Sequence, residues 1–488
     1  MTDWIIAPIL LPALTAAGMV TALRGRLGLQ RLVSVASVLG LNALAVALLW
    51  SVTVNGPQAY YLGDWPAPFG IVLMLDRQSA LMVALLAVLA LPVVVHAIGS
   101  GWDRQGAHFH PLVQFLLMGI AGAFLTGDAF NLFVFFEVLL IASYGLMVHG
   151  GGKARLRAGI TYVAFNLLGS ALFLIALGLL YAVTGTLNMA DLAQRLPALP
   201  AADTALLRVA AVLLLAVFAI KGALVPLQFW LPGTYAQAPG VVAALFAIMT
   251  KVGAYAALRF GTLVFPPDLS ATGPLYADLI FGAALGTVAL GSIGVLGAQG
   301  LPRLAAFAAI SSMGTAFLAI SAFTPAGTAA GMYYILHSTL ATALMFLVVD
   351  LVTRGEDGPR RQPGIAAALY LAGAIALAGL PPLSGFVGKL SVLQAWRDQA
   401  PLVWTTVLLG SFAMILGLAR TGSQVMWAPH ATPSRKPGLL ELAPALGLAL
   451  ALVALTVLAG PVTRWIGLTA DSLHDPQAYI AATLLGKG

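Results

Sequence analysis

Cysteine is absent from the 488 residues of this chain, and charged side chains are scarce. Without cysteine there is no disulfide framework, no thiolate nucleophile and no Cys-ligated zinc or iron–sulfur site. Charged residues make up 8% of the chain, against about 25% in soluble domains. Hydrophobic residues make up 60%. These values exclude an ordinary soluble domain and indicate a chain whose surroundings are a lipid bilayer.

Sequence motifs of the common enzyme classes are missing as well. There is no Gly-rich phosphate loop, no zinc-binding His-Glu pattern and no plausible catalytic triad. The formal charge of +7 comes from basic residues scattered singly among apolar runs. A nucleic-acid site would instead gather them into a patch. We therefore expect no enzymatic activity, no cofactor and no nucleic-acid partner.

Long apolar runs fill most of the chain. Stretches of about 17–25 apolar residues predict about fourteen transmembrane helices. The first run, Trp4 to Leu23, lacks a preceding basic region and a clear cleavage site, so we expect a retained span rather than a signal peptide. The connections 52–77 and 184–204 are rich in turn-forming residues and are expected to be surface loops. The predicted helices start near Trp4, Leu32, Gln78, Pro111, Phe130, Gly159, Leu206, Pro239, Tyr276, Arg303, Ala329, Gly364, Leu402 and Leu442.

The distribution of basic residues predicts the orientation of these helices. Most of the 24 Lys and Arg residues fall on the side of the first loop, which contains Arg24, Arg26 and Arg31. By the positive-inside rule this side faces the cytoplasm. Both termini are then outside, and the chain crosses the bacterial inner membrane many times.

Five titratable residues lie within or beside the apolar runs: Glu137, Lys221, Lys251, His337 and Lys389. A charged side chain at the centre of a spanning helix costs about 2.5–3.5 kcal/mol on insertion scales. Such residues persist where they face protein or water, and they usually mark an ion path. The pattern therefore favours proton movement over transport of an organic solute, because it provides single titratable groups rather than a substrate-binding cluster.

Each of these residues also has a structural interpretation. Glu137 could lock two helices through an ion pair, and Lys221 or Lys251 could extend its ammonium group to the lipid headgroups. His337, followed by Ser338 and Thr339, could hydrogen-bond a neighbouring helix. Lys389 follows a Gly- and Pro-containing segment and could lie in a polar loop.

Two short fragments indicate an internal repeat. Leu224-Val225-Pro226-Leu227 and Leu380-Pro381-Pro382-Leu383 match, and each lies close to a lysine. Both fall in the fourth helix of a five-helix stretch, 111–260 and 276–427. An odd number of spans inverts the second unit, as in transporters whose ion sites lie at broken helices. Proline interrupts helical hydrogen bonding, so we expect each break to be enclosed by protein or to line water.

Four segments are similar to those of Mrp-type multisubunit monovalent cation/proton antiporters, in particular their D-type subunits. They are Gly127 to Tyr144, Lys221 to Pro232, Ala238 to Gly253 and Leu380 to Phe386. The wider superfamily includes the antiporter-like subunits of respiratory complex I and of membrane-bound hydrogenases. The resemblance extends over nearly the whole chain. It implies an all-α membrane fold of about fourteen helices with two inverted five-helix repeats containing broken helices.

The resemblance also implies a division of the chain and a role for each residue. The regions would be a three-helix region 1–110, the repeats 111–260 and 276–427, and a C-terminal helix and tail 428–488. Glu137 and Lys221 would form the first half-channel pair, Lys251 the bridge, His337 a relay and Lys389 the exit group. The partners would be subunits of the A, B, C, E, F and G types.

The chemistry of these groups is consistent with proton transport coupled to Na⁺ or K⁺. Lysine is a donor only and does not hold a cation. The site for Na⁺ or K⁺ is therefore either shared with a partner subunit or not visible in the sequence, and no metal ligands are assigned. In the alternative function, the same proton path is driven by electron transfer in a complex I type or hydrogenase complex. A membrane enzyme is disfavoured by the missing motifs, and a stand-alone substrate transporter by the lack of a cluster suited to an organic substrate.

Overall fold

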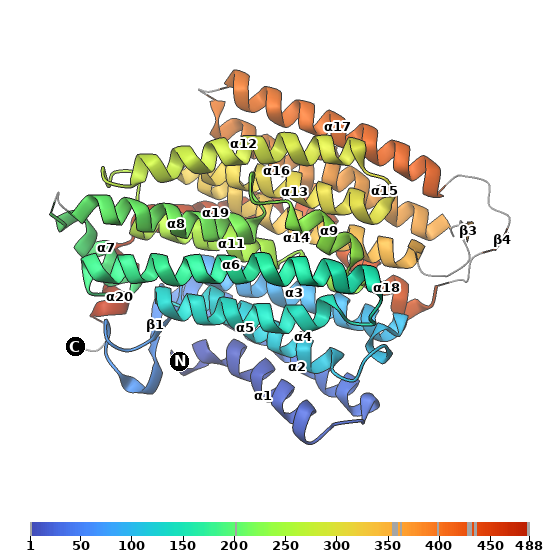
Figure 1. The fold of residues 1–488 in the computed structure, drawn as a ribbon, viewed down its shortest axis with the longest axis horizontal. Helices are drawn as coiled ribbons and strands as arrows, with labels where there is room; N and C mark the ends of the chain where they lie inside the picture. The colour runs from blue at the N-terminus through green and yellow to red at the C-terminus, as the bar shows by residue number, and fades with distance from the viewer. Residues whose placement is uncertain are drawn as a thin grey trace.

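Long helices lie side by side along most of the chain (Figure 1). The computed structural model describes residues 2–200, 203–353, 360–361, 364–397, 400–426, 432–433 and 437–485. Up to the first helix break the α-helices are α1 (Ala7–Thr21), α2 (Leu27–Asn55), α3 (Arg77–Ser100), α4 (Phe109–Leu125), α5 (Ala129–Met147), α6 (Lys153–Thr184), α7 (Met189–Arg195) and α8 (Thr204–Gly222). Beyond it lie α9 (Trp230–Gln237), α10 (Gly240–Phe246), α11 (Met249–Arg259), α12 (Gly273–Gly297), α13 (Leu301–Ile320), α14 (Pro325–Thr353), α15 (Gly364–Ala378), α16 (Ser384–Ala395), α17 (Ala400–Met426), α18 (Leu439–Val457), α19 (Ala459–His474) and α20 (Gln477–Leu484).

The helices agree with the spans predicted from hydropathy. Among the described residues, 12 helical segments are long and apolar enough to cross a membrane. Two shorter apolar helices, α4 and α15, lie where spans were predicted from Pro111 and Gly364. The helical prediction is confirmed, whereas the count of fourteen spans and the inverted repeat stay predictions.

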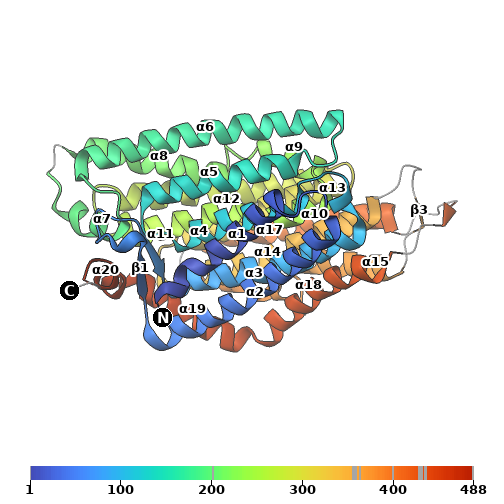
Figure 2. The same cartoon turned by 90° about the horizontal axis from the view of Figure 1, so that it is seen from below.

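Burial divides the helices into a centre and a periphery. In the most apolar 18-residue window of Gly240–Val264, which contains α10 and α11, all residues are buried. The share of buried residues in the corresponding window is 89% for α13 and for α14. By contrast, α2 is 33% and α18 28% buried, and their outer faces carry exposed side chains such as Trp50 and Leu450. Figure 2 shows α6 and α18 on opposite outer faces of the bundle. The central helices are therefore shielded from lipid by the peripheral ones.

Two spans are interrupted beside a lysine. Helix α8 ends at Gly222, and Ala223 adopts a left-handed conformation with φ 54° before α9 begins at Trp230. Helix α15 ends at Ala378, followed by Gly379 at φ +78°, and α16 begins at Ser384. Proline cannot continue the helical hydrogen-bond ladder, which accounts for a break at each matched fragment.

The two connections expected to be surface loops are more ordered than predicted. In 52–77, strand β1 (Gln58–Tyr61) pairs antiparallel with β2 (Val72–Leu75), and all four β2 residues are buried. The Tyr61 hydroxyl donates to the Thr483 carbonyl of α20 at 2.9 Å, so a helix far along the chain covers this hairpin. In 184–204, α7 has a largely buried first turn. A short parallel pair, β3 (Arg360–Arg361) and β4 (Thr432–Pro433), lies elsewhere.

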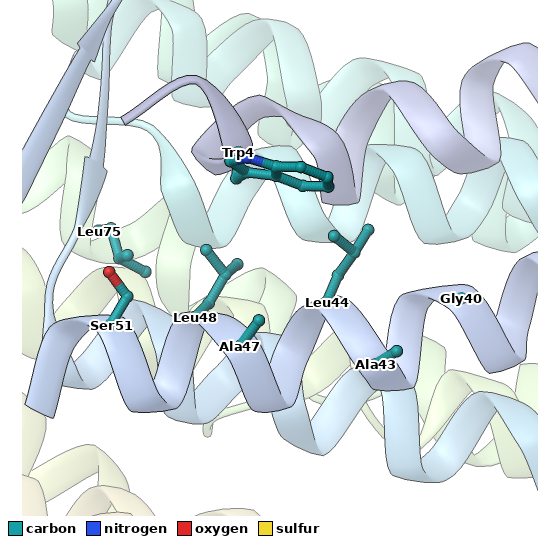
Figure 3. Close-up of a pocket in the computed structure, with 8 residues that line it drawn as sticks. All are labelled: Trp4, Gly40, Ala43, Leu44, Ala47, Leu48, Ser51 and Leu75. Carbon is teal, nitrogen blue, oxygen red and sulfur yellow. The ribbon is translucent and has the colours of Figure 1, made fainter. Parts of the chain in front are cut away.

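The N-terminus and α20 lie at the same end of the bundle (Figure 1). At that end an apolar pocket of about 500 Å³ lies between Trp4 and α2 (Figure 3). Its lining carries no titratable side chain: Trp4, Gly40, Ala43, Leu44, Ala47, Leu48, Ser51 and Leu75. This pocket therefore has no chemistry suited to moving a proton.

Candidate functional site

Glu137 lies in the middle of α5 and is half-buried. The hydroxyl of Ser170 on α6 donates a hydrogen bond to Glu137 Oε1. The same hydroxyl is also 3.1 Å from the Asn166 carbonyl oxygen. The neighbouring helix α6 therefore orients the Glu137 carboxylate through this hydrogen bond.

Lys221 occupies the last turn of α8, directly before the first break, and is 7% exposed. Its Nζ donates to Asn166 Oδ1 at 2.9 Å and lies 5.5 Å from the centre of the Phe136 ring. Gly253 of α11 allows the close approach of this turn, because a Cβ there would lie 2.7 Å from the Gly222 nitrogen. The lysine points into protein, so the interpretation that it extends to the headgroups is wrong.

Asn166 and Ser170 connect the acid to the lysine. They are one turn apart on α6, with Ser170 bonded to Glu137 and Asn166 bonded to Lys221. Within the described chain, Glu137 and Lys221 form no direct ion pair, although the two charges interact electrostatically. Sequence reasoning missed both α6 residues. Their spacing of four in an otherwise apolar run was the only available signal.

Lys251 lies in the first turn of α11 and is fully buried at 0% exposure. The only hydrogen bond described for its Nζ is to Thr250 Oγ1, at 3.5 Å. No carboxylate forms an ion pair with it in the part of the chain that the structure describes. Lys251 therefore occupies the enclosed centre, and its ammonium group does not extend to the headgroups.

His337 lies on α14, fully buried, and faces the second break. Its Nδ1 is 2.9 Å from the hydroxyl of Ser384, the first residue of α16. His337 interacts electrostatically with both Lys251 and Lys389. The ring is therefore close enough to both lysines to interact with their charges.

Lys389 is held at the broken end of α15. Its Nζ donates to the Ala378 carbonyl at 2.8 Å and to the hydroxyl of Ser411, on α17, also at 2.8 Å. A further contact of 3.4 Å reaches the Leu377 carbonyl. These carbonyls lost their helical partners at the break. Lys389 therefore lies on a helix and not in a polar loop.

The breaks themselves differ from the expectation in one respect. Pro226, Pro381 and Pro382 are exposed on the outside of this chain rather than enclosed. Side chains donate to carbonyls beside both breaks: Trp230 Nε1 to Ile220 O at 3.0 Å, which also accepts from the Ala223 nitrogen, and Lys389 Nζ to Ala378 O. Side-chain capping helps polar backbone to survive at these exposed breaks.

The structure thus places Glu137 and Lys221 in one cluster, and His337 and Lys389 in another, with the central Lys251 in electrostatic contact with His337. Among the described residues no group of three or more His, Asp or Glu side chains is arranged to hold a metal ion.

Comparison with known proteins agrees with this arrangement. The family model "NADH:quinone oxidoreductase/Mrp antiporter, TM" matches residues 126–417. The D-type subunit of a probable K⁺/H⁺ antiporter from Rhizobium meliloti is 38% identical over 98% of either chain. The D-type subunit of the Na⁺/H⁺ antiporter from Bacillus subtilis is 37% identical over 99% of this chain and 100% of its own.

Solved structures show the same fold. A chain of the Mrp complex from Dietzia sp. superposes with a TM-score of 0.91 at 28% identity, covering 99% of this chain and 100% of that one. A chain of respiratory complex I from Thermus thermophilus gives 0.80 at 25% identity, covering 96% and 99%. The predicted all-helical membrane fold and the resemblance drawn from the four segments are thereby confirmed. This chain belongs to the NADH:quinone oxidoreductase/Mrp antiporter family, among its Mrp-type D subunits.

Proposed function

We propose that this chain is the proton-translocating subunit of a multisubunit Na⁺(K⁺)/H⁺ antiporter. The observation that carries the proposal is the position of the titratable residues. Lys221, Lys251 and His337 are buried on α8, α11 and α14, and Glu137 and Lys389 flank them on α5 and α16. The related D-type subunits are named for Na⁺/H⁺ or K⁺/H⁺ exchange, which agrees with such a chain of groups.

The first step is a switch between Glu137 and Lys221. A carboxylate that approaches the ammonium group stabilises its charged form, whereas burial without a partner favours release of the proton. Ser170 holds the acid and Asn166 holds the lysine, so a side-chain rearrangement on α6 exchanges these partners for a direct pair. Making and breaking that pair loads and discharges Lys221.

The second step passes the proton through the centre. Lys251 is held by a single weak polar contact, so its ammonium group can change partners as the proton passes. His337 can accept a proton on one ring nitrogen while Nδ1 stays bonded to Ser384. Lys389 then receives the proton at the break after α15, where its carbonyl and hydroxyl partners stabilise the ammonium form.

The proposal also covers the cation site, the partner subunits and the location of the chain. A lysine chain offers no ligands for Na⁺ or K⁺, so the cation site is either shared with another subunit or not visible in this chain. We propose that the chain works with subunits of the A, B, C, E, F and G types. Its place is the bacterial inner membrane, and both termini are outside, because the loops rich in arginine face the cytoplasm.

Exchange in everted vesicles tests the proposal. The complete complex is produced in a bacterium without its own Na⁺/H⁺ and K⁺/H⁺ antiporters, and collapse of the pH gradient is followed by dye fluorescence after addition of Na⁺ or K⁺. Wild type should collapse the gradient, and Lys251→Ala should not. Equal rates in the two preparations would show that this residue is not on the proton path.

The alternative is a redox-driven pump, favoured by the likeness to a complex I chain. Identification of the co-purified native subunits by mass distinguishes the two functions. Small antiporter subunits support cation exchange, whereas iron–sulfur and quinone-site subunits would assign the chain to an electron-transfer complex.

A further inference from the structure

A buried titratable pair lies outside the proton path described above. His96 of α3 contacts Asp350, near the end of α14, with Nε2 and Oδ2 2.8 Å apart. His96 is 0% and Asp350 3% exposed. Trp102 Nε1 donates to the other carboxylate oxygen at 2.5 Å. His96 Nδ1 is 2.9 Å from the backbone carbonyl of Glu441, in the first turn of α18.

These contacts fix the number of protons on the pair. A carbonyl oxygen can only accept, so Nδ1 of His96 must carry a proton and donate it to Glu441. The contact between Nε2 and Oδ2 then needs a second proton, carried either by the imidazolium or by the carboxylic acid. The pair is neutral in both forms and holds one transferable proton.

Water can reach this pair through a polar pocket of about 640 Å³ at the end of the bundle where the arginine-rich loops lie. Asp350 and Trp102 line it, together with Gln105, Arg155 and Gln237. Two charged groups are close by. The Arg155 guanidinium lies 5.3 Å from the Trp102 ring centre, and the Glu441 carboxylate accepts from the Gly438 nitrogen. Asp103, next to Trp102 in sequence, is paired with Arg31 and His110.

The pair is connected to the central residues by two helices. Asp350 and His337 share α14 and are 13 residues apart, about 20 Å along the axis. Helix α10 starts directly on Asp350, since a Cβ at Gly240 would lie 2.6 Å from Asp350 Cβ, and the chain continues from it to Lys251. Between these points α14 carries the buried hydroxyls of Ser338, Thr339 and Thr342. The Thr342 hydroxyl has no protein hydrogen-bond partner among the described residues.

We propose that Asp350 and His96 form the proton-release site at this end of the molecule, connecting Lys251 and His337 to the water of the polar pocket. The inference rests on the proposed function. In the transfer, the proton between Nε2 and Oδ2 leaves to the pocket water, and the pair is left with one negative charge. A proton that arrives from the centre by way of the α14 hydroxyls and intervening water then restores it.

Replacing Asp350 by asparagine separates this role from a structural one. In Asp350→Asn, the amide oxygen can still accept from Trp102, the amide nitrogen can donate to His96 Nε2, and Nδ1 keeps its bond to Glu441. These three hydrogen bonds survive, but the transferable proton between Nε2 and Oδ2 is lost. We expect normal assembly and cation-dependent exchange lowered by about 100-fold, the size of effect typical for loss of a proton-transfer group. Exchange within about twofold of wild type would overturn the proposal.

Two companion variants make the outcome specific. Lys153→Ala changes an exposed residue at the same end but outside the pocket and should exchange at the wild-type rate. Lys251→Ala tests the proposed function itself in the same preparations. If Lys251→Ala is inactive and Asp350→Asn is active, the release site is wrong while the proton path stands. If both are active, the proposed function fails.

A labelling experiment avoids any question of folding. The chain has no cysteine, so Gln237→Cys places one thiol in this subunit, in the wall of the pocket. Everted vesicles expose the cytoplasmic side, and a bulky membrane-impermeant methanethiosulfonate reagent should then block exchange. Lys153→Cys, exposed at the same end but outside the pocket, is the matched control and should be insensitive. Full exchange after complete labelling of Gln237→Cys would overturn the proposal.

Discussion

The ammonium group of Lys221 donates a hydrogen bond to the amide oxygen of Asn166, at 2.9 Å. Sequence reasoning paired this lysine with Glu137, whose carboxylate is instead hydrogen-bonded by Ser170, one turn further along α6. The two charges interact without touching. The pair is therefore open in the structure: Ser170 and Asn166 of α6 each bind one of the two charged side chains, which do not contact each other.

The first prediction concerns the charges of Lys221 and Glu137. Lys221→Ala and Glu137→Ala should each abolish cation-dependent proton exchange while the complex still assembles, because neither residue alone can load and discharge a proton. Glu137→Asp should retain part of the activity, since the charge survives with a shorter reach. Dye fluorescence in everted vesicles and co-purification of the subunits are the two measurements. Full exchange in either alanine variant would falsify the pairing.

The second prediction concerns Asn166. Asn166→Asp places a permanent carboxylate within hydrogen-bond distance of Lys221 and should hold the lysine in its charged form. We expect exchange to fall by about tenfold, roughly what 1.4 kcal/mol of extra stabilisation of one state produces. Asn166→Gln keeps an amide and should be milder. An aspartate variant as active as wild type would mean that Lys221 does not need to discharge.

The third prediction distinguishes a titrating lysine from a fixed positive charge. Lys251→Ala should abolish exchange. Lys251→Arg should fail as well, because a guanidinium does not release its proton in proteins. The same vesicle measurement applies, with assembly checked in parallel. Normal transport by Lys251→Arg would leave this residue with an electrostatic role only.

Sequence reasoning identified the five titratable residues because a charge inside an apolar run is rare and costly. Sequence reasoning did not identify Asn166 and Ser170, because uncharged polar residues are common in packed transmembrane helices. Sequence reasoning did not identify Asp350 and His96 for a different reason. They lie near helix ends, where charged residues are common and carry no signal.

Elements that depend on distant contacts were also missed. The β1–β2 hairpin forms in a segment whose composition indicates a loop, and its Tyr61 is held by the backbone of α20, more than 400 residues away in sequence. Local propensity contains no information on such a contact. The exposure of Pro226, Pro381 and Pro382 was not predicted, because a proline-containing break in the sequence does not indicate which side of the broken helix faces protein.

The fourth prediction is a pH dependence of stability outside the membrane spans. Burial disfavours ionisation of Asp103, but hydrogen bonds from His110 and Arg31 outweigh it, so the pKa of this carboxyl lies below its usual range. A depressed folded-state pKa stabilises the fold above the unfolded value of about 3.9, and the stabilisation is lost as the pH falls through the folded value. The thermal midpoint of the solubilised complex should therefore drop on acidification below about pH 4.

Asp103→Asn should remove this acid sensitivity and lower stability at neutral pH by about 2 kcal/mol, the size of a hydrogen bond to a charged group, because Arg31 loses its charged partner and is 23% exposed. The matched control is Asp191→Asn. Its partner Arg195 is 48% exposed, and a surface pair contributes only about 0.2–1 kcal/mol. Equal losses in the two variants would contradict a special role for the Asp103 cluster.

The last prediction concerns Gly379, at the second break. Its φ of +78° is a conformation that side chains rarely adopt, and an added Cβ would lie 2.5 Å from Lys389 Cδ and 3.2 Å from Nζ. Gly379→Ala should therefore push the ammonium group away from the Ala378 carbonyl and lower exchange, while the remaining helices pack as before. The left-handed backbone adds about 1–2 kcal/mol of strain. Gly178→Ala on α6, where an added Cβ meets nothing within 4 Å, is the matched control and should exchange like wild type. If Gly379→Ala exchanges at the wild-type rate, the capping geometry of Lys389 is not needed for transport, and only the titration of its ammonium group can matter at that site.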